Sequence, residues 1–130
     1  MATTTGTFEP VVRDLFTALD AVDTGRLRSY LADDSQSVDE LSGGWLRGRD
    51  AVEAYFDRLK DSVSDVHSRL GSVQSTEWGD TAIFTCELEQ TYRLEGQEQR
   101  LRAPTTIVGR RENGDWKIVL VHSVPLAEQP

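Results

Sequence analysis

His122 and Ser123 attract attention first, because a histidine beside a serine is the pairing that nucleophilic catalysis uses. The two residues are adjacent on a predicted strand, so their side chains face opposite ways and cannot form a nucleophile and base. The chain has only one further histidine, His67, and a single cysteine, Cys86. This composition disfavours a zinc site, and without a glycine-rich phosphate loop no cofactor is implied.

Two polar residues interrupt a row of apolar residues in the second half of the chain. The stretch 82–94 alternates apolar residues with Thr and Glu, which predicts a strand, and Gln90 and Tyr92 continue its apolar face. A few polar groups among apolar ones are typical of a cavity wall, and Thr105 would add another from the next strand. We expect a small hydrophobic ligand as the partner. Tyr92 lies near a strand end, so its hydroxyl could instead point to water.

Apolar residues at helical spacing predict three helices that would position these groups. The first covers 8–22, and a break at 23–25 precedes a short second helix that ends at 32–34. Gly48 and Asp50 open the third, which carries Tyr55 on its apolar face. We take Tyr55 as a further candidate for the pocket.

Strand patterns fill the remainder of the chain. The stretch 35–41 is expected to be a strand before a turn at Gly43 and Gly44, and 66–77 is an ambiguous, bulge-prone strand. The strand around Thr105 contains Pro104, which predicts an edge or a bulge. Asn113 and Gly114 form a hairpin turn before 116–124, a strand that is apolar on both faces. One layer of helices covers one face only, so we expect a homodimer through the outer face of the sheet.

Length and charge narrow the possible partners. The 130 residues fit one domain, expected at 8–126 after a flexible leader (1–7) and before a tail (127–130). A net charge of −8 disfavours binding to nucleic acid or to anionic membranes, and no apolar run is long enough to span a bilayer. A single cysteine calls for no oxidising compartment, so we expect a cytoplasmic protein.

The order of elements and two segments identify a family resemblance. The segments are WLRGRDAV at 45–52, before the third helix, and NGDWKIVLVHS at 113–123, in the last strand. With the order of elements from 8 to 126, they resemble the SnoaL-like and nuclear transport factor 2-like superfamily. The resemblance implies an α+β cone, with three helices packed on the concave face of a strongly curved, mostly antiparallel sheet. The superfamily includes isomerases, cyclases, hydrolases, dehydratases and noncatalytic modules, so it does not fix the function.

The same resemblance suggests catalytic residues. Asp39, on the short strand after 32–34, is similar in position to the general base of ketosteroid isomerases. A carboxylate at a cavity mouth can move a proton when apolar walls raise its pKa, whereas an aspartate in water at a strand end would be inert. His122 would be its proton partner if its face lines the cavity, and otherwise a core or interface residue. Trp45 either covers the cavity mouth or anchors the third helix.

Steroid isomerisation itself is disfavoured by two departures from the isomerase pattern. The first predicted helix lacks the required tyrosine, and Thr105 or Thr106 stands where the second acid would be. Two interpretations therefore remain. The protein is either a cofactor-free enzyme that transfers protons on a hydrophobic carbonyl compound, or a noncatalytic module for ligand binding or dimerisation.

Overall fold

A computed structural model describes residues 6–38 and 44–126, which form an α+β domain, as expected from the sequence. Its elements in chain order are α1 (Phe8–Asp20), α2 (Thr24–Tyr30), β1 (Leu31–Val38), β2 (Trp45–Arg47), α3 (Arg49–Ser62), β3 (Val63–Trp78), β4 (Thr81–Leu94), β5 (Gln97–Glu112) and β6 (Asp115–Ser123). None of the described helices is long and apolar enough to cross a membrane.

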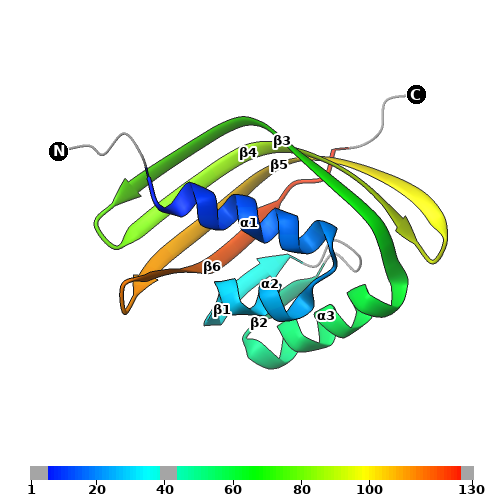
Figure 1. The fold of residues 1–130 in the computed structure, drawn as a ribbon, viewed down its shortest axis with the longest axis horizontal. Helices are drawn as coiled ribbons and strands as arrows, with labels where there is room; N and C mark the ends of the chain where they lie inside the picture. Colours follow the sequence, from blue (N-terminus) through cyan, green and yellow to red (C-terminus); the bar gives the residue numbers. More distant parts are fainter. Residues whose placement is uncertain (1–5, 39–43, 127–130) are drawn as a thin grey trace.

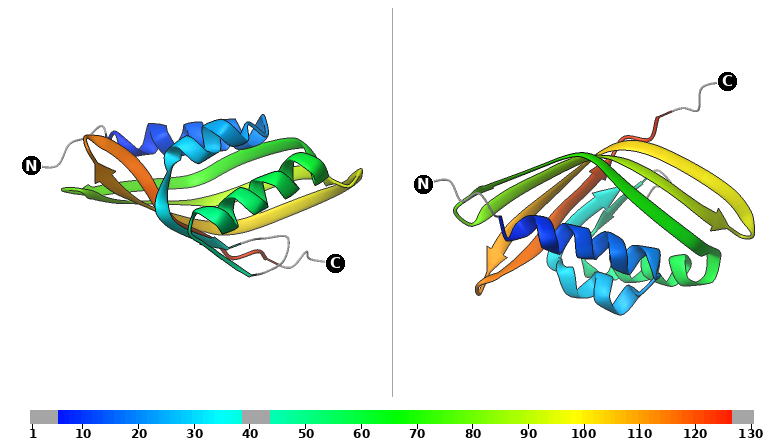
Figure 2. Two further views of the ribbon diagram at one scale, coloured as in Figure 1. Left: turned by 90° about the horizontal axis from the view of Figure 1, so that it is seen from below. Right: turned by 45° about the horizontal axis from the view of Figure 1, so that its top comes forward.

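The strands form one curved sheet in the order β2-β1-β6-β5-β4-β3. Only β1 and β6 pair in parallel, and the other neighbours are antiparallel. Helix α1 lies across the hollow face of the sheet, with α2 and α3 beside it (Figures 1 and 2). The expected cone, with three helices on the concave face, is therefore confirmed, and it creates an interior between helices and sheet.

The helix boundaries follow from local conformation. Helix α1 ends two residues before its predicted end, where Val22 adopts a positive φ of 50° that no helix continues. The Asp23 carboxylate then accepts a hydrogen bond of 3.2 Å from the Arg26 N–H and so caps α2. Gly48, with φ of 81°, precedes α3.

Strand β1 begins at Leu31, four residues earlier than predicted, and the short strand β2 was not predicted at all. The early part of β1 contains Asp33 and Asp34, which are exposed and disfavour a strand by local preference. Arg110 on β5 donates hydrogen bonds of 2.9 and 3.2 Å to the Asp34 carboxylate and thereby lowers the pKa of that group. Contacts between distant strands therefore override the local pattern.

Two predicted irregularities have different outcomes. Strand β3 is bulged, with register shifts between Ser64 and His67 and between Gly71 and Gln74. Pro104, however, lies neither at an edge nor at a shift in the β4–β5 register. Its carbonyl accepts a hydrogen bond of 3.0 Å from Val124, one residue beyond β6. The side of Pro104 that lacks an N–H therefore faces the chain just beyond the end of β6.

The core at the start of α1 centres on two aromatic rings. Phe8 is fully buried and packs edge-on against Trp116 of β6, with ring centroids 5.3 Å apart. The Trp116 Nε1 donates a hydrogen bond of 2.6 Å to the Thr7 hydroxyl. The beginning of α1 is thus fastened to the last strand of the sheet.

Candidate functional site

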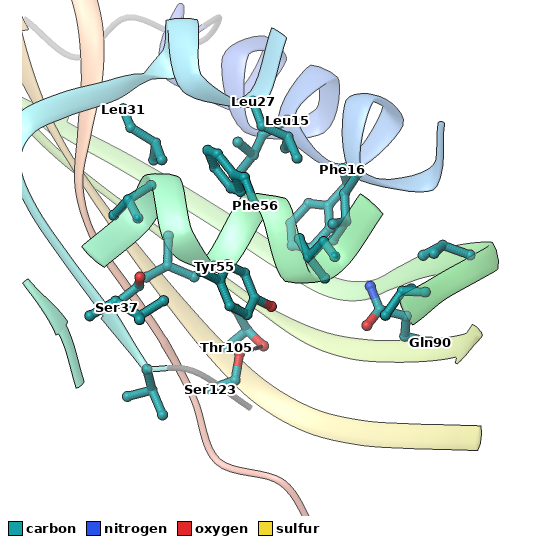
Figure 3. Close-up of a pocket in the computed structure, with 18 of the residues that line it drawn as sticks. Leu15, Phe16, Leu27, Leu31, Ser37, Tyr55, Phe56, Gln90, Thr105 and Ser123 are labelled. Atoms are coloured by element: carbon teal, nitrogen blue, oxygen red, sulfur yellow. Dashed lines mark hydrogen bonds between the residues drawn. The ribbon is translucent and has the colours of Figure 1, made fainter. Parts of the chain in front are cut away.

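A cavity of about 150 Å³ lies between the three helices and the sheet (Figure 3). Leucine, valine and phenylalanine side chains from α1, α2, α3 and the strands form most of its wall. The polar side chains on the wall are Ser37, Tyr55, Gln90, Tyr92, Thr105 and Ser123. None of the described residues that line the cavity is charged.

Four of the five expected pocket residues lie around this cavity. Tyr55 reaches it from α3, Gln90 and Tyr92 from β4, and Thr105 from β5. Trp45 lies elsewhere: it belongs to the edge strand β2, its side chain is 49% exposed, and it is not on the wall. The alternating pattern of β4 and β5 thus brings three separated polar groups to one interior surface.

A bulge in β6 decides which of its residues face the cavity. Ile118 pairs with Gly109 and Leu120 pairs with Val108, so Val119 is an extra residue in the strand. Strict alternation would put His122 on the same face as Ile118, but the extra residue reverses the phase after it. Val121 and Ser123 therefore line the cavity, and His122 faces outward.

His122 stacks on Trp45 on the outer side of the sheet. The two rings are nearly parallel, with an interplanar angle of 9° and centroids 5.9 Å apart. The Arg47 guanidinium lies on the same indole, 5.1 Å from its centroid. The structure therefore brings two of the predicted site residues together, but away from the cavity.

Gln90 is held by a hydrogen-bonded chain that leads back to α1. The Gln90 side-chain nitrogen donates to the Ser68 hydroxyl at 2.9 Å, and this hydroxyl donates to Asp20 Oδ1 at 2.7 Å. The Ser68 backbone N–H donates to Asp20 Oδ2 at 3.1 Å. Asp20, in the last turn of α1, thus fixes the position of the Gln90 amide, which lies on the sheet side of the cavity (Figure 3).

Thr105 and Ser123 form a second polar pair, on the β5 and β6 side of the wall. Their hydroxyl oxygens are 2.9 Å apart, and the Thr105 hydroxyl also donates to the Ala103 carbonyl at 3.1 Å. Both side chains are buried, with 3% and 6% of their surface exposed. Each hydroxyl is therefore satisfied within the protein, as buried polar groups need to be.

The predicted base, Asp39, lies outside the described residues. Its predecessor in the sequence, Val38, is the last residue of β1 and lines the cavity. No group of three or more His, Cys, Asp or Glu side chains that could hold a metal ion occurs within 6–38 and 44–126. Burial raises the pKa of the Cys86 thiol to about 11, so this cysteine behaves as a neutral core residue.

Sequence reasoning missed four polar residues of the site: Ser37, Ser68, Ser123 and Asp20. Ser37 and Ser123 lie on strands whose irregular pairing hides the face that each residue takes. Asp20 and Ser68 are 48 positions apart, and no local pattern indicates that they meet. The bulge at Val119 leaves no clear signal in the sequence either, because apolar residues occupy both faces of β6.

Solved structures share the fold at low sequence identity. A candidate aromatic ring hydroxylase from Novosphingobium aromaticivorans has a TM-score of 0.83 at 15% identity, over 93% of this chain and 87% of that chain. A candidate dehydratase of the NTF2-like family from Streptomyces avermitilis has a TM-score of 0.80 at 20% identity, over 93% and 95%. The S. rosetta CaMKII hub has a TM-score of 0.77 at 18% identity, over 95% and 100%. At these identities the similarity shows the fold alone.

Sequence comparison identifies the family. A search of curated proteins finds no match to the chain. The family model of the SnoaL-like domain matches residues 9–127, which is nearly the whole sequence. This agrees with the cone of helices and sheet and with the resemblance seen in the two sequence segments. The protein belongs to the SnoaL-like family.

Proposed function

We propose that the protein binds a small, neutral and mainly apolar molecule in the cavity between helices and sheet. The observation that carries this proposal is the composition of the described wall, which is mostly apolar, with six polar groups and no charge. An ionised ligand there would lose its hydration without a partner of opposite charge, at a cost of several kcal/mol. A volume of about 150 Å³ suits a ligand the size of one aromatic ring.

Toluene is a suitable first probe, because it has this size and no polar group. We expect saturable binding by calorimetry and a rise in melting temperature, since a ligand that binds only the folded state stabilises it. Leu19→Trp, which adds a ring to the α1 face of the wall, should abolish both effects. Thr17→Trp adds the same ring to an exposed position of α1 and should leave them unchanged.

Failure of toluene and of other one-ring compounds to bind the wild-type protein would overturn this proposal. Equal loss of binding in Leu19→Trp and Thr17→Trp would also contradict it, because Leu19 lies on the cavity wall and Thr17 does not.

A second candidate function is proton transfer on a hydrophobic carbonyl compound, with Asp39 as the general base. The supporting observation is that Val38, directly before Asp39, lines the cavity. Gln90, Tyr92 and Thr105 would orient the substrate, and the reaction would need no cofactor. The similarity in fold to a candidate dehydratase and a candidate ring hydroxylase agrees with small-molecule chemistry in this type of interior.

We also propose a homodimer formed through the outer face of the sheet. Ile83, Val108 and Leu120 pair across β4, β5 and β6, and thus form an apolar row on that face. The similarity in fold to a hub domain is consistent with self-association. A sedimentation experiment should give a dimer at micromolar concentration. Separately, we expect the protein to be located in the cytoplasm.

Val108→Glu should give a monomer, because it would bury a charge in the proposed interface. Gln97→Glu, at the exposed end of β5, is the matched control and should remain dimeric. A wild-type monomer at micromolar concentration would contradict the homodimer.

A further inference from the structure

Two hydrogen-bonded chains cross the wall of the cavity, and each ends at a group that accepts hydrogen bonds. The first chain ends at the Asp20 carboxylate, which can only accept when ionised. Ser68 must therefore donate its single hydroxyl proton to Asp20, at 2.7 Å. The Ser68 oxygen then accepts from Gln90, which assigns the nitrogen of the Gln90 amide to the side of Ser68.

The amide oxygen of Gln90 is left for the cavity. It has no hydrogen-bond partner among the described residues, although Gln90 is a buried residue with only 8% of its surface exposed. One hydrogen on the amide nitrogen also remains. Gln90 can therefore accept a hydrogen bond from a ligand and donate one in return.

The second chain ends at the Ala103 carbonyl, which is an obligatory acceptor. When Thr105 donates its only hydroxyl proton to this carbonyl at 3.1 Å, Ser123 is the donor in the 2.9 Å contact with Thr105, a contact in which either hydroxyl can donate. Its only proton is then used, and the Ser123 oxygen offers the cavity lone pairs alone. The hydroxyls of Tyr55 and Tyr92 can donate or accept, and so they do not set a direction.

We infer that the cavity, if it binds ligands as proposed above, selects a neutral one-ring compound with a hydroxyl group over a compound of similar size without a donor. A hydroxyl can donate to Ser123 or to the Gln90 oxygen, and it can accept from the remaining Gln90 hydrogen. An ether or a ketone can only accept, so it would fill the cavity without giving the Gln90 oxygen, or the remaining lone pair of Ser123, a hydrogen bond. Asp20 and Ser68 act as positioning residues, because they orient the Gln90 amide without touching the ligand.

The inference is tested with phenol and anisole, which differ by the methyl group that replaces the hydroxyl proton. Their dissociation constants are measured by calorimetry for the wild type, for Gln90→Leu and for Ser123→Ala. We compare the anisole-to-phenol ratio between proteins, because the ratio of ratios cancels the difference in hydration between the two ligands. Removing the acceptor that the ligand uses should reduce the ratio about five-fold, as expected for one lost hydrogen bond.

Ser68→Ala tests the positioning role and keeps Gln90 in place. It should lower the same ratio while toluene binding stays unchanged, a pattern that a general loss of stability would not produce. Ser68→Ala also keeps the inference testable if Gln90→Leu does not fold. Gln74→Leu, at an exposed position of β3, is the matched control and should keep the wild-type ratio.

The possible failures are distinguishable. If toluene, anisole and phenol bind but the ratio is the same in wild type, Gln90→Leu, Ser123→Ala and Ser68→Ala, the inferred selectivity is wrong and the binding site stands. If none of the three compounds binds the wild-type protein, the proposed function fails, and the inference fails with it.

Discussion

The ring of Phe8 lies directly over the α-carbon of Gly109. A β-carbon added at Gly109 would be only 2.2 Å from Cε1 of Phe8. Gly109 has no positive φ, so its role is to provide space and not an unusual backbone conformation. The close approach lets the first residue of α1 pack flat on β5 while its ring meets Trp116. This contact fixes the distance between the start of α1 and the sheet, and α1 forms one side of the cavity.

Gly109→Ala should lower the free energy of unfolding by about 2 kcal/mol or more, because overpacking displaces either the helix or the strand. In a Phe8→Leu background the same substitution should cost less, since the smaller side chain leaves room. A double-mutant cycle by urea unfolding measures the difference. Equal costs in both backgrounds would show that Phe8 does not limit the space at Gly109.

Trp116→Ala should destabilise the protein by about 3 kcal/mol or more, the usual cost of truncating a buried tryptophan. Trp116 is 7% exposed, and the substitution also removes its hydrogen bond to Thr7. Trp78, which is 58% exposed, provides the control, and Trp78→Ala should change stability by less than about 0.5 kcal/mol. Similar effects of the two substitutions would contradict the packing at the start of α1.

Asp20→Asn should destabilise the fold by about 1 to 3 kcal/mol, because the hydroxyl and the N–H of Ser68 donate to different carboxylate oxygens and asparagine replaces one of these oxygens with a donor. Asp14 on the same helix pairs with Arg26 at the surface. Asp14→Asn should therefore cost less than about 1 kcal/mol. Chemical denaturation of both variants measures the two changes in stability. An Asp20→Asn protein as stable as the wild type would show that the hydrogen bonds from Ser68 to Asp20 do not stabilise the fold.

Asp39→Asn tests the second candidate function. On a substrate of the proposed type, activity should fall at least about a hundredfold, since a general base contributes that much. The melting temperature should stay level or rise, because a carboxylate kept for catalysis in an apolar site costs stability. Titration of the Asp39 carboxyl by NMR gives an independent measurement. An ordinary value near 3.9 would leave Asp39 a solvated residue and would favour the noncatalytic interpretation.

The stability of the protein should decrease in alkaline solution through Cys86. Burial, and to a lesser degree Glu87, raises the pKa of this thiol from 9.0 to about 11 in the folded protein. Between these values the unfolded chain loses a proton that the folded chain retains, so the free energy of unfolding falls as the pH rises. The slope is at most about 1.4 kcal/mol per pH unit.

Unfolding measurements of the wild type and of Cys86→Ala between about pH 8 and about pH 11 isolate this contribution. The difference between the two curves should diminish with pH. Parallel curves would mean that the thiol ionises equally in both states.

The sequence predicted the fold well where its patterns are regular. Strand β4 alternates cleanly, and its pattern placed Gln90 and Tyr92 on the face that lines the cavity. The start of β1, the strand β2 and the phase of β6 could not be predicted in this way. They depend on pairing with strands that are distant in the sequence, and charged or uniformly apolar residues hide the period. The contact between Asp20 and Ser68 is of the same kind, because only the packing of α1 on β3 creates it.

The bulge at Val119 has an evolutionary consequence. Strand β6 already accommodates one surplus residue without losing its pairing to β5. A deletion of Val119 would restore regular alternation and keep Ser123 on the wall, whereas an insertion after Leu120 would turn His122 inward and Ser123 outward. One mutational step of this kind would replace a hydroxyl with an imidazole in the cavity. The strand therefore offers a short route by which a protein of this shape could acquire an internal acid or base.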